Sequence, residues 1–238
     1  MLSNKRILAV VPARGGSKGI KLKNLRKING ISLVEYACGI ISELPYIDRA
    51  VVSTDHPEIR QVAVKAGVDA PFIRPEKLSG DIVADIDVLT HALLATEKDD
   101  GQHYDIIVML QPTSPMRKPR HVTQTINKLI NGDFDAVWTV SKTDSKAHPL
   151  KQLTFNGDCL EYYDPRGADI IARQQLSDLY HRNGVAYAIT RTCLIDFKSI
   201  KGKKTSAVLI DEPLANIDTE TDLLWAEYLI HLEREKVE

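Results

Sequence analysis

Short apolar runs alternate with stretches of helical spacing over most of this 238-residue chain, and this alternation restricts the possible folds more than any other feature. The first run, residues 7–11, is wholly apolar and is closed by Pro12. Such a run is typical of a strand that is buried on both faces of a sheet. A glycine-rich loop follows, and residues 33–44 then carry apolar side chains at helical spacing up to Pro45. Strand, loop and helix in this order form the repeating unit of α/β proteins.

The same unit recurs along the chain. The sequence predicts further strands at residues 49–54, 68–73, 105–110, 135–140, 184–190 and 206–210, and further helices at residues 58–66, 83–97, 119–130, around Leu194 and at 220–235. Between about 141 and 182 this order breaks into short, charged pieces. We therefore predict a single α/β domain over residues 1–238, with a mainly parallel (mixed) central sheet and with residues 141–182 inserted as a lid or an oligomerisation arm.

The composition argues against several classes of protein. Lysine and arginine (31) almost balance aspartate and glutamate (32), so no global charge attracts nucleic acid or an anionic membrane. No apolar run reaches the length of about eighteen residues that a membrane span needs, and we expect no export signal. Cys38, Cys159 and Cys193 are widely separated, which favours free thiols in a reducing cytoplasm over disulfides or a zinc site.

The loop after the first run concentrates features that suit a phosphate group. It contains four cations, Arg14, Lys18, Lys21 and Lys23, and three glycines, Gly15, Gly16 and Gly19. Glycine lets backbone N–H groups approach a ligand closely, and the cations neutralise its charge. Neither a Walker A motif nor G-x-G-x-x-G can be drawn through the loop, which weakens the alternative of a Rossmann dehydrogenase. An ordinary solvated turn is a further alternative, but we interpret the loop as a site for a polyphosphate.

Parallel α/β sheets bind ligands at the carboxyl ends of their strands, where loops converge. Four segments occupy such positions: the first loop and residues 53–55, 111–115 and 215–218. We expect these four segments to surround one site.

Seven blocks of sequence point to a particular family. They are residues 12–20 (PARGGSKGI) with 23–25, residues 74–78 with Asp81, and residues 110–117 (LQPTSPMR), 148–151, 173–175, 183–187 (NGVAY) and 217–220. In this order the blocks resemble the signature of the cytidylyltransferases that activate sialic acids and related nonulosonates, the acylneuraminate cytidylyltransferase (CMP-sialic acid synthetase) family. The resemblance extends from residue 7 to about residue 230 and implies a Rossmann-like, three-layer nucleotide-diphospho-sugar transferase fold.

The resemblance also implies an activity, in which CTP and a free nonulosonic acid give a CMP-activated acid and pyrophosphate. By this resemblance Arg14, Lys18 and Lys23 hold the triphosphate and stabilise its charge during the reaction. The other residues that it places at the nucleotide are Gly15, Gly16 and Ser17 of the loop, Asn24 at the ribose, Arg74 at the cytosine, and Asp85. Arginine offers a planar fork to phosphate oxygens and lysine a mobile point charge, which suits these roles.

The acceptor acid and a metal ion complete the implied site. The resemblance places Gln111, Lys151, Arg173, Asn183 and Tyr187 at the sugar, where a carboxylate and many hydroxyls need cations and amides. It places Mg²⁺, or another divalent cation, on Asp218 and Asn216. Magnesium commonly takes one or two carboxylates and completes its shell with phosphate and water. An N-cap of the last helix is the alternative role for Asp218.

Three positions depart from the family's pattern. Asn216 stands where the family usually has a second aspartate, so we expect weaker metal binding or more reliance on substrate phosphates. His181 stands where relatives often have arginine, and Asp85 stands where sialate enzymes tend to have a small hydroxyl residue. These departures leave open a different nine-carbon acid, a 3-deoxy-octulosonate acceptor, or a non-catalytic nucleotide-binding homologue. The segment 141–182 resembles the part of these enzymes that reaches a second subunit, so we expect a cytoplasmic homodimer.

Overall fold

A six-stranded sheet forms the centre of the computed structural model, which describes residues 2–235. Its strands are β1 (Ile7–Pro12), β4 (Arg49–Ser53), β5 (Ile106–Met109), β6 (Ala136–Lys142), β9 (Tyr180–Thr190) and β10 (Thr205–Leu209), in the order β10-β6-β9-β5-β1-β4. β1 lies parallel to β4 and β5, and β10 lies parallel to β6. β9 is antiparallel to both β5 and β6. The prediction of an α/β fold with a mainly parallel, mixed sheet is therefore confirmed.

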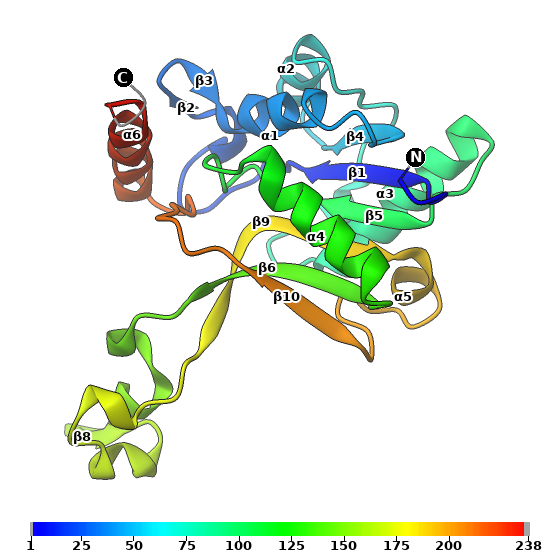
Figure 1. Cartoon of the computed structure of the whole chain (residues 1–238). Coiled ribbons are helices and arrows are strands. Elements are labelled where there is room, and N and C mark those ends of the chain that lie inside the picture. Colours follow the sequence, from blue (N-terminus) through cyan, green and yellow to red (C-terminus); the bar gives the residue numbers. More distant parts are fainter. Residues whose placement is uncertain (1, 236–238) are drawn as a thin grey trace.

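Helices cover both faces of this sheet and give three layers (Figure 1). They are α1 (Leu33–Ser42), α2 (Pro57–Lys65), α3 (Asp85–Asp100), α4 (Pro119–Asn131) and α5 (Arg191–Ile195). α6 (Glu220–Glu235) lies to one side of the sheet, where it packs with Ile20 and Ile28 in a third core (Figure 1). Ile7, Ala9 and Val11 of β1 pack into one core with α1, α2 and α4. Leu8 and Val10 pack into a second core with α3 and α5. Side chains alternate between the two faces of a strand, which explains why the first run is apolar at every position.

Most of the expected helices and strands lie within a few residues of their predicted bounds, but the strand predicted at 68–73 is wrong. That segment makes a single bridge, between Val51 and Asp69, beside the edge strand β4. Pro71 follows two residues later and has no N–H group with which to continue a ladder. Apart from two strands in the inserted segment, two short strands were not predicted, β2 (Lys27–Ile28) and β3 (Ile31–Ser32), which form a hairpin.

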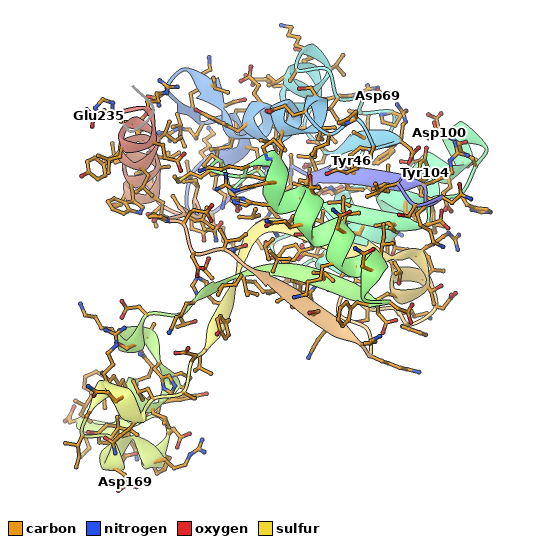
Figure 2. The ribbon with its side chains drawn as sticks, viewed as in Figure 1. Tyr46, Asp69, Asp100, Tyr104, Asp169 and Glu235 are labelled. Atoms are coloured by element: carbon orange, nitrogen blue, oxygen red, sulfur yellow. The ribbon has the colours of Figure 1, made fainter. Side chains whose placement is uncertain are left out.

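The chain between β6 and β9 forms a projecting arm, which we define as residues 143–179. Figure 1 shows the arm standing away from the sheet, and Figure 2 shows Asp169 at its far end. The arm contains the hairpin β7 (Leu153–Asn156) and β8 (Cys159–Tyr162), whose eight residues are all exposed. Its 3₁₀ turns are η3 (Ser145–Ala147), η4 (Pro149–Lys151), η5 (Pro165–Asp169) and η6 (Arg173–Gln175). The predicted insertion at 141–182 contains this arm together with the ends of β6 and β9, and its role as a lid or dimer contact stays a prediction.

Two further 3₁₀ turns, η1 (Lys23–Leu25) and η2 (Glu76–Leu78), lie in loops of the main body. Within residues 2–235, none of the helices has the length and apolar character needed to cross a bilayer. The three cysteines are free thiols: Cys38 and Cys193 are buried, and Cys159 is exposed on the arm.

Candidate active site

A cavity of about 500 Å³ lies at the carboxyl ends of β1 and β5. Its walls come from the first loop, from the segment 74–88, from the loop after β5 and from the turn before α6. Three of the four segments that were expected to surround one site therefore line it. The fourth, residues 53–55, lies behind the first loop, where the Asp55 carboxylate accepts a hydrogen bond from Gly15 N (2.8 Å).

The glycines of the first loop serve close packing inside the protein. A Cβ at position 15 would lie 2.8 Å from the His56 ring, and one at position 19 would lie 2.5 Å from the backbone oxygen of Asp218. Gly16 has open space around it, and Ser17 lines the cavity. The Gly15 N–H is already bonded to Asp55. Gly15 thus lets the loop pack against His56, and Gly19 lets it pack against the turn before α6, besides any contact that the glycines make with a ligand.

Each of the three predicted triphosphate cations is paired with a carboxylate across the cavity. Arg14 Nη1 lies 2.7 Å from Asp81 Oδ1, and Lys18 Nζ lies 2.9 Å from Asp81 Oδ2. Lys23 Nζ lies 2.8 Å from Asp218 Oδ1. Hydrogen bonds from Lys18 and Arg14 lower the pKa of Asp81, so this carboxylate is ionised at neutral pH. A polyphosphate must therefore take these cations from Asp81 and Asp218.

Asn24 and Arg74 are buried supports of the site. Asn24 Nδ2 donates to the Arg14 carbonyl oxygen (2.9 Å), which fixes the backbone of the first loop. Arg74 donates from Nε to Ser53 Oγ (3.1 Å) and from Nη2 to the Ser53 carbonyl oxygen. Burial lowers the pKa of Arg74 to about 10, so its guanidinium remains charged at neutral pH. Both residues also line the cavity, and their predicted contacts with ribose and cytosine remain predictions.

Of the residues predicted for the acceptor, Gln111 lines the cavity. Asn183 and Tyr187 are buried close to it: Asn183 Oδ1 accepts from Thr139 Oγ1 (2.6 Å), and the Tyr187 hydroxyl accepts from Gly184 N (3.1 Å). Asn183 also lines a neighbouring hollow of about 450 Å³ together with Asn216.

A buried arginine that sequence reasoning missed, Arg117, joins these segments. It donates from Nη2 to the carbonyl oxygens of Gln111 (2.6 Å) and Gly184 (3.2 Å). Gly184 has a φ of +73°, and a Cβ there would lie 2.6 Å from Gln111 Oε1. Glycine is therefore required where β9 approaches the loop after β5.

Lys151 and Arg173, the two cations predicted for the acceptor, lie elsewhere. Both are exposed on the arm, in η4 and η6, and neither lines the cavity. The arm projects away from the body that carries Gln111 (Figure 1). Within one copy of the chain the structure does not bring these two cations together with the other acceptor residues.

The turn before α6 separates the two roles considered for Asp218. Thr219 and Asp222 form the N-cap of α6: Thr219 N donates to Asp222 Oδ2 (2.7 Å), and Asp222 N donates to Thr219 Oγ1 (3.3 Å). The Asp218 carboxylate instead lines the cavity and is 67% exposed. Asn216 faces the neighbouring hollow. The helix cap is thus accounted for without the Asp218 side chain.

A mixed α/β sheet that gathers a basic loop and an acidic turn at the carboxyl ends of its strands suits a nucleotide-binding protein. The structure resembles that of CMP:2-keto-3-deoxy-manno-octonic acid synthetase complexed with CTP, with a TM-score of 0.70 and 18% identity over 96% of this chain and 99% of the other. Residues 8–216 match the family model described as Cytidylyltransferase. The chain belongs to that family.

Curated relatives match along almost their whole length. The chain is 31% identical to a CMP-N,N'-diacetyllegionaminic acid synthase of Legionella pneumophila, over 97% of this chain and 98% of the relative. It is 29% identical to the post-translational flagellin modification protein B of Campylobacter coli, over 94% of each chain. The resemblance to nonulosonic acid cytidylyltransferases is thereby confirmed.

Proposed function

We propose that this protein uses CTP to activate a nonulosonic acid, a nine-carbon sugar acid such as a sialic acid or a relative, and releases pyrophosphate. The observation that carries the proposal is the single cavity lined by Arg14, Lys18, Lys23, Gln111 and Asp218. These residues come from three segments that are far apart in the sequence. The relatives named as CMP-sugar acid synthases support the same activity. Free thiols support a reducing, cytoplasmic environment.

In the reaction, the anomeric oxygen of the acid forms a bond to the α-phosphorus of CTP. The bond from that phosphorus to the bridging oxygen of the β-phosphate breaks, and pyrophosphate leaves with the electron pair while the hydroxyl proton passes to solvent. Arg14, Lys18 and Lys23 neutralise charge on the triphosphate. Catalysis then consists of positioning and charge neutralisation, and no side chain is assigned as general base.

The donors in the cavity fit a magnesium ion that is bound mainly by the nucleotide. No group of three or more histidine, cysteine, aspartate or glutamate side chains that could hold a metal occurs in the part of the chain that the structure describes. Asp218 supplies one carboxylate beside the cations of the triphosphate site, and phosphate oxygens and water can supply the rest. When bound, the ion neutralises charge on the phosphates. Because Asn216 stands where the family usually has a second aspartate, we expect weaker magnesium binding than at an aspartate pair.

Replacing Asp218 tests the metal assignment. In Asp218→Ala, the magnesium concentration that gives half-maximal activity should rise roughly tenfold or more, because the one protein carboxylate at the ion is lost. The melting temperature should stay unchanged, since Thr219 and Asp222 cap the helix. Glu220→Ala is the matched control. Glu220 lies two residues after Asp218, and its carboxylate pairs with Arg26. If the magnesium titration is unchanged, Asp218 does not bind the metal and serves only as the counter-ion of Lys23.

The acceptor site is completed, in our proposal, by a second copy of the chain. Gln111, Asn183 and Tyr187 belong to the body, whereas Lys151 and Arg173 lie on the arm. The arm leaves large apolar side chains in solvent, with Phe155 75% exposed and Ile171 93% exposed. A homodimer in which each arm reaches the partner's cavity covers apolar surface and delivers two cations to the carboxylate of the acid.

A pyrophosphate-release assay tests the activity directly. We expect release only when CTP, among the four nucleoside triphosphates, is combined with a nine-carbon acid from a panel of ulosonic acids. If only an eight-carbon acid is turned over, the acceptor is a 3-deoxy-octulosonate and not a nine-carbon acid. Nucleotide binding without release across the whole panel would indicate a non-catalytic homologue, the reading that Asn216 alone suggests.

A further inference from the structure

Part of the cavity wall is poorly suited to a triphosphate. Besides Asp81, which pairs with the cations of the first loop, the segment 74–88 contributes the apolar side chains Leu78, Val83 and Val88, together with Arg74 and Asp85. Phosphate groups gain nothing from apolar side chains, and a carboxylate repels them. A flat aromatic ring with polar groups along one edge is the part of a nucleotide that fits such a wall.

The two charged side chains of this wall keep hydrogen-bonding capacity. Arg74 uses Nε and Nη2 on Ser53, and its Nη1 has no hydrogen-bond partner among residues 2–235. Asp85 is the first residue of α3, and no residue in the described range donates a hydrogen bond to its carboxylate or forms an ion pair with it. The carboxylate is partly buried beside Arg74 and Arg182, and burial raises its pKa. A half-buried acceptor without a donor is costly to leave unpaired, so a ligand group that donates to Asp85 gains affinity.

The edge of cytosine is complementary to this pair of side chains. Cytosine presents two acceptors, O2 and N3, followed by the N4 amino group as donor. Uracil presents an acceptor, the N3–H donor and then O4 as acceptor. A guanidinium N–H can donate to O2 or N3 of cytosine, and aspartate accepts from cytosine N4 in other recognition sites. Uracil would set its O4 against the carboxylate, two acceptors facing each other.

We propose that Asp85 selects the nucleotide: its carboxylate accepts the N4 amino group of cytosine beside Arg74 and rejects uracil. The proposal rests on the CTP-dependent function proposed above and names the residue that sets the base.

The test compares Asp85→Asn with the wild-type protein. The amide can donate to O4 of uracil as readily as it accepts from N4 of cytosine, so the ratio of kcat/KM for CTP over UTP should fall roughly tenfold or more. The ratio of dissociation constants for CMP and UMP, measured by calorimetry without any acid, should fall in parallel. Asp87→Asn is the control, since Asp87 is exposed on the same turn of α3 and does not line the cavity.

The outcomes separate this inference from the proposed function. A wild-type protein that binds CMP more tightly than UMP, with an Asp85→Asn variant that keeps that preference within about twofold, would overturn the role of Asp85 and leave the CTP-dependent activity standing. A wild-type protein that binds neither nucleotide would overturn the proposed function itself. If Asp85→Asn does not fold, Asp85→Ser takes its place, and the same loss of discrimination is expected.

Discussion

Arg14→Ala is expected to lower kcat/KM for CTP roughly a hundredfold or more, because it removes a charge-assisted donor from the proposed triphosphate site. The side chain of Arg14 is 29% exposed and its one ion pair in the described structure is with Asp81, so little else depends on it. Asn24 bonds to the Arg14 backbone and keeps its partner in the variant. Steady-state pyrophosphate release at varied CTP, with thermal melting as a check of folding, measures the effect.

Two matched variants make this result specific. Lys21→Ala removes a cation from the same loop that is exposed and does not line the cavity, and its kcat/KM should change less than about twofold. Arg14→Lys keeps the charge but loses the planar fork, so its activity should lie between those of Arg14→Ala and the wild type. Equal activity in Arg14→Ala and Lys21→Ala would mean that the first loop acts through its total charge, not through Arg14.

Local patterns in the sequence predicted the sheet and the first loop because burial and turn chemistry act over short distances. The apolar run at β1 needs only its own residues to be recognised as buried on two faces. The failure at 68–73 has an equally local cause, since Pro71 interrupts the ladder and could have been given more weight. The cap of α6 was also readable, because Thr219 and Asp222 have the spacing of a capping box. The role of helix cap could therefore have been assigned to Thr219 and Asp222, and not to Asp218, from the sequence alone.

Contacts between distant residues could not be predicted in this way. Asp81 pairs with Arg14 across 67 positions of sequence, and no local pattern marks it as the carboxylate that neutralises the first loop. Arg117 connects the loops at Gln111 and Gly184 by donating hydrogen bonds to their carbonyl oxygens. These contacts depend on the order of the strands in the sheet. The separation of Lys151 and Arg173 from the body follows from the direction in which the arm leaves β6. Such arrangements are set by tertiary packing, which a linear pattern does not contain.

Mixed subunits should recover activity that neither parent has. We expect Arg14→Ala to be inactive because of a defect in the body of the protein. We expect the double variant Lys151→Ala, Arg173→Ala to be inactive because of a defect in the arm. In a mixed dimer whose arms cross to the partner, one site joins an intact body with an intact arm, and the other site carries both defects. Random pairing in equal amounts makes half of the dimers mixed, so co-expression should restore roughly a quarter of the wild-type activity. Two affinity tags allow the mixed dimers to be isolated and assayed alone.

The same experiment distinguishes crossing arms from arms that fold back on their own body. If each arm serves its own copy, no site in a mixed dimer is intact, and no activity returns. Arg166→Ala is the control on the arm, because Arg166 is exposed and pairs only with Asp164 among the described residues, so this variant should stay active. Full activity of the double arm variant by itself would remove Lys151 and Arg173 from the site. Light scattering that finds a monomer at micromolar concentration would contradict the homodimer, whereas recovery in mixed dimers assigns the acceptor's cations to the partner subunit.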